Sequence, residues 1–157
     1  MKAEKECVLV IDTIRSAHNT GSMFRTADGA GVSSIILTGY TPAPIEKGKA
    51  RPDIAKVALG AEISIPWSKE DTAVEALTRL KEEGYTILAL EKVEGAISLF
   101  EYESPMKFAL FVGNEVDGIP DGVLQLCDAI LEIPMRGIKE SLNVSVATGV
   151  ALYHLLS

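Results

Sequence analysis

The sequence predicts a single α/β domain with a mostly parallel sheet and helices on both faces. Short apolar runs, each typical of a buried strand, recur along the whole chain. Helical patterns separate most of these runs, and this alternation is typical of parallel strands covered by helices on both sides. The length of 157 residues suits one domain with a substantial core, so we expect one domain over 1–157.

Six apolar runs are the predicted strands. They cover 7–11, 33–38, 63–67, 85–90, 108–112 and 129–134. The clearest helix covers 69–83, where Val74, Leu77 and Leu80 recur on one face and Gly84 ends the pattern.

Two further segments complete the expected elements. A helix is expected to begin near Asn19, a residue type favoured as N-cap. Its buried face would contain Met23, Phe24, Ala27 and Ala30. Segment 39–53 holds three prolines and two glycines and is predicted to be an irregular loop, and 91–107 is irregular with a short strand near 97–102.

The charge of the chain is unevenly distributed. The net charge of −7 argues against a general binder of DNA or RNA, because phosphate contacts need Lys and Arg. Residues 1–60 nevertheless carry eight basic and six acidic side chains, whereas 61–157 carry seven and sixteen. Five basic residues of the first part are candidates for a local positive patch: Arg15, Arg25, Lys47, Lys49 and Arg51.

Cysteine usage and hydropathy indicate a cytoplasmic protein. Cys7 and Cys127 lie in separate strand-like runs, a spacing that fits reduced buried thiols and neither a metal site nor a disulfide framework. The N-terminal segment has too short an apolar run for a signal peptide, and no run reaches the length of a membrane span. We therefore expect no membrane partner.

Three strand ends carry polar residues at the sheet edge where α/β proteins bind ligands. Asn19, Gly21 and Arg25 follow the first strand, although a helix cap and a surface ion-pair partner would also explain Asn19 and Arg25. Gly113 and Glu115 follow the strand at 108–112, where a missing Cβ lets a ligand approach the backbone and where simple chain reversal is the alternative. Glu115 has no second acid or His at ligand spacing, so no metal site is expected.

The third strand end leads into the last helix. Ser141 is a candidate N-cap for that helix. Pro134 interrupts the hydrogen bonding of the strand, which leaves backbone groups free beside Ile133, Met135 and Leu142. An apolar slot with free backbone groups suits a flat purine ring, while a cap with ordinary core packing is the alternative.

Taken together, these segments resemble the three ordered motifs of the SpoU (TrmH-like) RNA ribose 2′-O-methyltransferases, in the SPOUT class. The residues that carry the resemblance are Asn19, Gly21, Arg25, Thr26 and Ala27, then Phe111–Glu115, then Ile133–Met135 with Ser141–Ala147; Ala58–Glu62 also resembles a segment between the first two motifs. The resemblance covers the chain from about Val8 to Leu155.

This resemblance implies a fold, a cofactor and partners. The fold would be a SPOUT α/β fold with a C-terminal deep trefoil knot, and the chain would form a homodimer with its active site at or near the interface. S-adenosylmethionine would contact Gly113, Ile133 and Leu142, with Met135 and Leu90 as neighbours. Arg25 would be the central catalytic residue, with Asn19, Glu115, Ser141 and Asn143 arranging the site around a ribose of tRNA or rRNA.

Other functions remain open at this stage. A minimal domain of this class could methylate a group other than a ribose. A non-catalytic RNA-binding or assembly protein that retains the fold is the alternative from another class, but intact motifs at all three strand ends argue against it. A dinucleotide-binding domain is disfavoured, because HNTGSMFR lacks the required glycine spacing.

Overall fold

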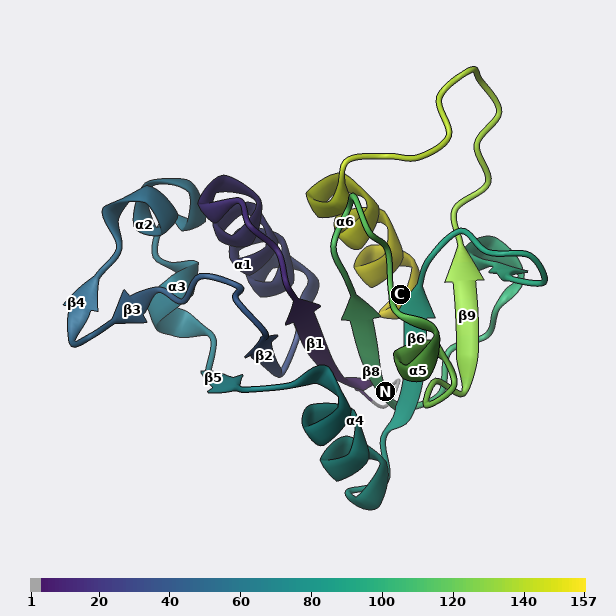
Figure 1. The fold of residues 1–157 in the computed structure, drawn as a ribbon, viewed down its shortest axis with the longest axis horizontal. Coiled ribbons are helices and arrows are strands. Elements are labelled where there is room, and N and C mark those ends of the chain that lie inside the picture. The colour runs from purple at the N-terminus through teal and green to yellow at the C-terminus, as the bar shows by residue number, and fades with distance from the viewer. Residues whose placement is uncertain (1–3) are drawn as a thin grey trace.

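The computed structural model describes residues 4–157, which form a seven-stranded sheet in the order β5-β2-β1-β8-β6-β9-β7 (Figure 1). Its strands are β1 (Glu6–Asp12), β2 (Ser34–Thr38), β5 (Trp67–Glu70), β6 (Thr86–Leu90), β7 (Ile97–Ser98), β8 (Lys107–Val112) and β9 (Ala129–Glu132). Each neighbouring pair runs parallel. The predicted parallel α/β sheet is confirmed.

Helices cover both faces of this sheet, as predicted. They are α1 (Ala17–Ala30), α2 (Pro52–Ala58), α3 (Ala61–Ser64), α4 (Ala73–Glu82), α5 (Asp121–Leu124) and α6 (Val144–Leu155), with a 3₁₀ turn, η1, at Leu99–Glu101. Residues of α1, α2, α3 and α6 share one buried cluster with the sheet, whereas α4 and α5 contribute to a second cluster on the opposite face. Every helix in the described part of the chain is too short or too polar to cross a membrane.

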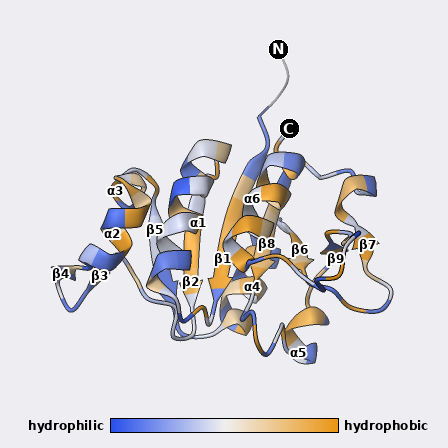
Figure 2. Cartoon of the chain, turned by 90° about the horizontal axis from the view of Figure 1, so that it is seen from above, coloured by the Kyte–Doolittle hydropathy of each residue, from blue (hydrophilic) through white to orange (hydrophobic). Residues whose placement is uncertain are grey.

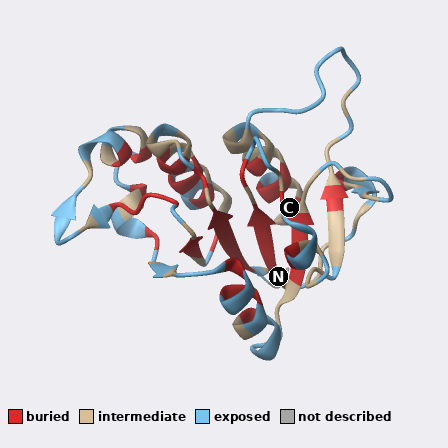
Figure 3. Ribbon diagram, viewed as in Figure 1, coloured by how far each residue is buried: buried red, intermediate tan, exposed pale blue. Residues whose placement is uncertain are grey.

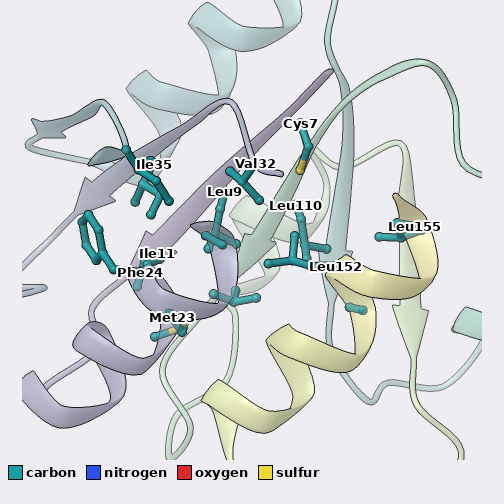
Figure 4. Close-up of a cluster of buried hydrophobic side chains, with 14 of the residues drawn as sticks. Cys7, Leu9, Ile11, Met23, Phe24, Val32, Ile35, Leu110, Leu152 and Leu155 are labelled. Atoms are coloured by element: carbon teal, nitrogen blue, oxygen red, sulfur yellow. The ribbon is translucent and has the colours of Figure 1, made fainter. Parts of the chain in front are cut away.

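The core follows from the alternation of side chains along the central strands. In β1, Cys7, Leu9 and Ile11 pack beneath α1 and α6, whereas Val8 and Val10 face the other helical layer (Figure 4). The central strands are therefore buried on both sides, and hydrophobic residues concentrate there and in α6 (Figures 2 and 3). Burial raises the pKa of the Cys7 thiol to about 12, so this cysteine is an inert core residue.

Two predicted elements, the strand at 63–67 and the helix at 69–83, differ from the structure. The expected strand at 63–67 is instead α3 followed by β5, which begins at Trp67. The expected helix at 69–83 begins later, because Trp67–Glu70 pairs with β2 and Thr72 caps α4 by accepting a hydrogen bond from the backbone N–H of Glu75. Val74, expected on the buried face of α4, is exposed, and Ala73 and Ala76 are buried there instead.

Two smaller expectations need correction, and a third is confirmed. Segment 39–53, expected to be irregular, contains the hairpin of β3 (Ile45–Glu46) and β4 (Lys49–Ala50) and the start of α2. The last predicted strand ends at Glu132 rather than at residue 134, and Cys127 lies in the turn before it. The short strand expected near 97–102 is β7, followed by η1.

The register of the sheet brings the predicted strand ends together. Asp12 of β1 pairs with Thr38 of β2, and Ile11 of β1 pairs with Val112 of β8. On the other side, Leu90 of β6 pairs with Leu131 of β9. The carboxyl ends of these strands therefore lie along one edge of the sheet, where α/β proteins bind ligands.

Candidate active site

A pocket of about 420 Å³ lies at this carboxyl edge. The loops after β6, β8 and β9 and the start of α6 form its walls. The predicted site residues that line it are Leu90, Gly113, Glu115, Ile133, Met135, Ser141 and Leu142. Segments that are far apart in the sequence thus supply one cavity, as expected for a ligand site.

Asn114 joins the loop after β8 to two neighbouring loops. Its side-chain Nδ2 donates to the backbone oxygen of Thr13 (2.9 Å) and to the Tyr40 hydroxyl (3.0 Å). Its Oδ1 accepts from the backbone N–H groups of Val116 (2.8 Å) and Asp117 (2.9 Å). We did not predict this role from the sequence; the available signal was a Gly-Asn-Glu turn, in which Asn side chains commonly bond nearby backbone.

Glu115, the next residue, meets Asn19. The Asn19 Nδ2 donates to Glu115 Oε1 at 3.2 Å, so residues of the first and second motifs are in direct contact. The expectation that Asn19 caps its helix is wrong. Ser16 is the N-cap of α1 and accepts from the backbone N–H of Asn19, which leaves the Asn19 amide free to reach Glu115.

Gly113 lines the pocket, but its lack of a side chain also serves the packing of the chain itself. A Cβ at Gly113 would lie 2.9 Å from Cγ1 of Ile119, too close for a real contact. Ile119 is held in turn by Glu91, whose Oε2 accepts from the Ile119 backbone N–H at 2.9 Å. Glu91 also accepts from the backbone N–H of Lys92, so it ties the loop after β6 to the loop after β8.

The third motif forms the opposite wall of the pocket. Figure 1 shows the segment from β9 to α6 as a long loop at the molecular surface, and Ile133, Met135, Ser141 and Leu142 of this loop line the cavity. The expected cap at Ser141 is wrong. Asn143 caps α6, because its Oδ1 accepts from the backbone N–H (2.9 Å) and hydroxyl (2.6 Å) of Ser145.

Three predicted residues, Asn19, Asn143 and Arg25, lie outside the lining of the cavity. Asn143 adjoins it between Leu142 and Val144, both of which line it. Arg25 is exposed on α1, and within residues 4–157 it makes no hydrogen bond or ion pair by the usual distance criteria. Its helix packs against α6, where a Cβ at Gly149 would lie 3.2 Å from the Thr26 methyl group.

Two arginines of the expected positive patch have different partners. Arg51 is engaged by Glu46 (3.3 Å) and Asp53 (2.6 Å), and its hydrogen bond to Asp53 is the main cause that raises the pKa of Arg51 and lowers the pKa of Asp53. Arg15 lies instead over the ring of Tyr40, with Cζ 5.9 Å from the ring centre.

The electrostatics of the pocket are strongly acidic. One basic side chain, Lys92, lines it together with six carboxylates, those of Glu91, Glu115, Asp117, Asp121, Glu132 and Glu140. Within residues 4–157, no three His, Cys, Asp or Glu side chains gather closely enough to hold a metal ion. The arrangement favours an organic ligand that combines a flat apolar group with positive charge.

Comparisons with known proteins agree with this geometry. The 23S rRNA (guanosine-2′-O-)-methyltransferase RlmB of Neisseria meningitidis is 34% identical over 151 residues, which are 96% of this chain and 58% of that protein. The tRNA (guanosine(18)-2′-O)-methyltransferase of Aquifex aeolicus is 31% identical over 152 residues, covering 97% and 69% of the two chains. The chain thus spans only part of the length of these relatives.

Solved structures show the same fold. An AdoMet-bound rRNA methyltransferase from Sinorhizobium meliloti superposes with a TM-score of 0.87 at 27% identity, covering 98% of this chain and 56% of that one. A structure described for the 2-OH methylation of C/U34 on tRNA matches with a TM-score of 0.81 at 28% identity, covering 96% and 94%. The model of the SpoU rRNA Methylase family matches residues 6–153, so the family predicted from the three motifs is confirmed. The chain belongs to the SpoU rRNA methylase family.

Proposed function

We propose that the chain is an S-adenosylmethionine-dependent methyltransferase that acts on a ribose 2′-hydroxyl of tRNA or rRNA. The observation that carries this proposal is the pocket at the sheet edge, which unites residues of the second and third motifs. Relatives that match almost the whole chain bear the names of guanosine 2′-O-methyltransferases, and a solved neighbour holds AdoMet.

The pocket residues fit the proposed cofactor. A volume of about 420 Å³ lies in the range of sites for small organic ligands. Leu90, Ile133 and Leu142 supply apolar surface for the adenine, and the surrounding carboxylates suit the positively charged amine and sulfonium. S-adenosylmethionine supplies an activated methyl group on that sulfur and becomes S-adenosylhomocysteine when the methyl leaves. We assign Gly113 and Met135 to the same contact surface.

We assign the ribose to the side of the pocket where Asn19 and Glu115 are joined. The 2′-oxygen bonds to the methyl carbon as the carbon–sulfur bond breaks, and its proton leaves to water. Glu115 and Ser141 line the pocket and Asn143 adjoins it, so we assign these polar groups to orienting the ribose. A guanidinium presents a fixed planar fork of N–H donors that suits an oxyanion, so we assign Arg25 to the developing alkoxide or to the adjacent phosphate. We infer that it reaches the site across a subunit interface.

Membership of the SpoU family supports further proposals about the molecule as a whole. We propose that residues 1–157 act as the catalytic domain, that two copies form a homodimer, and that the C-terminal part forms a trefoil knot. We also propose a cytoplasmic location, which fits the supply of tRNA and rRNA there.

Calorimetric titration with S-adenosylhomocysteine tests the cofactor site. We expect saturable binding to the wild type and loss of binding in Leu142→Arg, because Leu142 lines the pocket. Ile138→Arg is the matched control: it places the same residue in the same loop, at a side chain that is 99% exposed. This control should bind as the wild type does.

Transfer of a labelled methyl group to tRNA and rRNA fractions then tests the reaction. Incorporation at a ribose 2′-oxygen supports the proposal, and incorporation at a base would contradict the ribose assignment. A folded protein that binds RNA but neither S-adenosylhomocysteine nor S-adenosylmethionine would instead indicate the non-catalytic RNA-binding alternative.

A further inference from the structure

An exposed aromatic ring lies beside the candidate active site and is fixed from two sides. Tyr40 follows β2 and is 51% exposed. Its hydroxyl accepts a hydrogen bond from Asn114 Nδ2 at 3.0 Å, and the Arg15 guanidinium lies over the ring at 5.9 Å from its centre. Three loops at the carboxyl edge of the sheet thus meet at one tyrosine.

This ring is closely connected to the proposed ribose position. Asn114, which holds the Tyr40 hydroxyl, directly precedes Glu115, and Glu115 accepts from Asn19. Asn114 is itself buried and bonded to the Thr13 backbone, so it gives the tyrosine a rigid anchor. An aromatic ring held in this way loses little conformational entropy when a planar group stacks on it.

The charges around the site indicate which planar group the ring accepts. Carboxylates dominate the pocket and repel phosphate, so an RNA strand needs positive charge outside the pocket. Arg15 is exposed and offers a planar fork of donors suited to phosphate. Proteins commonly hold unpaired RNA bases by stacking them on aromatic rings while basic side chains contact the phosphates.

We propose that Tyr40 and Arg15 form a platform on which an unpaired RNA base next to the methylated ribose stacks. The base lies on the Tyr40 ring, and Arg15 contacts the neighbouring phosphate. This inference rests on the proposed function, since it names how the same site holds its RNA. It requires the target nucleotide to lie in a loop or another unpaired segment.

Binding of RNA to two variants of Tyr40 tests the platform. The probes are unfractionated bacterial tRNA and fragmented 23S rRNA, with affinity measured by filter binding. Tyr40→Leu removes the π-surface and should weaken binding about 5- to 150-fold, which is the typical cost of losing one stacked base. Tyr40→Phe keeps the ring and loses only the hydrogen bond to Asn114, so its RNA affinity should stay within a few-fold of the wild type.

Matched controls separate stacking from general damage. Phe100→Leu makes the same kind of change at another exposed aromatic residue, in η1, and should leave RNA affinity unchanged. Affinity for S-adenosylhomocysteine should be equal in all variants, because Tyr40 does not line the cofactor pocket.

The possible outcomes distinguish this inference from the proposed function. Equal RNA affinity of Tyr40→Leu and wild type would overturn the platform while leaving the methyltransferase intact. Equal losses in Tyr40→Phe and Tyr40→Leu would also overturn it, since the tyrosine would then act only through Asn114. A wild type that binds no cofactor would contradict the proposed function, and a selective loss of RNA binding in Tyr40→Leu would support the platform even then.

Discussion

At the scale of single residues, Arg25 is the catalytic candidate that the isolated chain leaves outside its own pocket. We expect Arg25→Lys to lower kcat/KM for RNA methylation about 100-fold or more, because a lysine lacks the planar fork that an alkoxide or phosphate would meet. Steady-state assays with a saturating methyl donor measure this. Affinity for S-adenosylhomocysteine should stay within twofold, and near-normal turnover of Arg25→Lys would contradict the assignment.

The helix caps show how far residue type alone can place a functional side chain. Ser16 and Asn19 are both good N-cap residues, and so are Ser141 and Asn143. Propensity does not distinguish candidates that lie two or three positions apart. The geometry decides: Ser16 and Asn143 cap the helices, Asn19 is released to contact Glu115, and Ser141 is released to line the pocket.

At the scale of elements, the close packing of α1 against α2 explains why α1 contains a glycine, Gly21. A Cβ at Gly21 would lie 2.8 Å from the Ile54 backbone oxygen and 2.9 Å from Val57 Cβ, both in α2. We expect Gly21→Ala to lower the free energy of unfolding by about 1–2 kcal/mol, because overpacking against backbone outweighs the gain of about 1 kcal/mol in helix propensity. Urea unfolding measures the change.

Gly29→Ala is the control for this prediction. It makes the same substitution in the same helix, but its Cβ would meet only the Tyr153 hydroxyl, the end of an exposed side chain that is able to move. Gly29→Ala should be neutral or stabilising by up to about 1 kcal/mol. Similar losses in both variants would show that the spacing of α1 and α2 is not what requires Gly21.

The strands buried on both faces were predicted correctly, because a strand in that position is continuously apolar. β1, β2, β6 and β8 have this character, and their predicted positions agree with the structure to within one or two residues. β5 lies at the edge of the sheet with the mostly polar sequence Trp67–Glu70, so its hydropathy resembles a loop. The run at 63–67 was predicted as a buried strand from its apolar residues, but Ile63 lies on α3 and is 87% exposed.

At the scale of the whole molecule, the pocket was predictable as a meeting of strand ends, whereas its full lining was not. Parallel strands place their carboxyl ends along one edge, which brought seven of the predicted residues into one cavity. The roles of Asn114 and Glu91 depend on hydrogen bonds between loops, and these follow from no local pattern. The trefoil knot stays a prediction, which an experimental chain trace over 86–157 would decide.

The proposed homodimer predicts a specific use of α6. The helical spacing of Ala147, Val150, Ala151 and Leu155 suggests one apolar face for the partner, but Ala151 and Leu155 are buried in the core of the chain. The apolar residues left outward are Val146, 52% exposed, and Tyr153. Val146→Arg should therefore raise the dimer dissociation constant at least 100-fold by placing a charge in the interface.

Sedimentation velocity checks this expectation, since the dimer has twice the mass of the 16.8 kDa chain. Ile63→Arg is the control, because it adds the same charge at an exposed apolar residue of α3. We expect the control to stay dimeric and Val146→Arg to sediment as a monomer. A Val146→Arg protein that stays dimeric would place the interface elsewhere.

If the chain is the proposed methyltransferase, the acidic lining of the pocket also predicts how it distinguishes the methyl donor from the spent product. S-adenosylmethionine carries a sulfonium charge that S-adenosylhomocysteine lacks. The lining of the pocket contains six acidic residues and one lysine, so it has a surplus of negative charge. Attraction to this surplus should favour the methyl donor and should weaken as salt shortens the screening length from about 10 Å at 0.1 M to about 3 Å at 1 M. We expect the ratio of the two affinities to fall several-fold over that range in calorimetric titrations. Glu132→Gln should lower the ratio at low salt, whereas Glu101→Gln in η1, outside the lining, should not. A ratio independent of both salt and Glu132 would mean that contacts to the methyl group, rather than charge, separate donor from product.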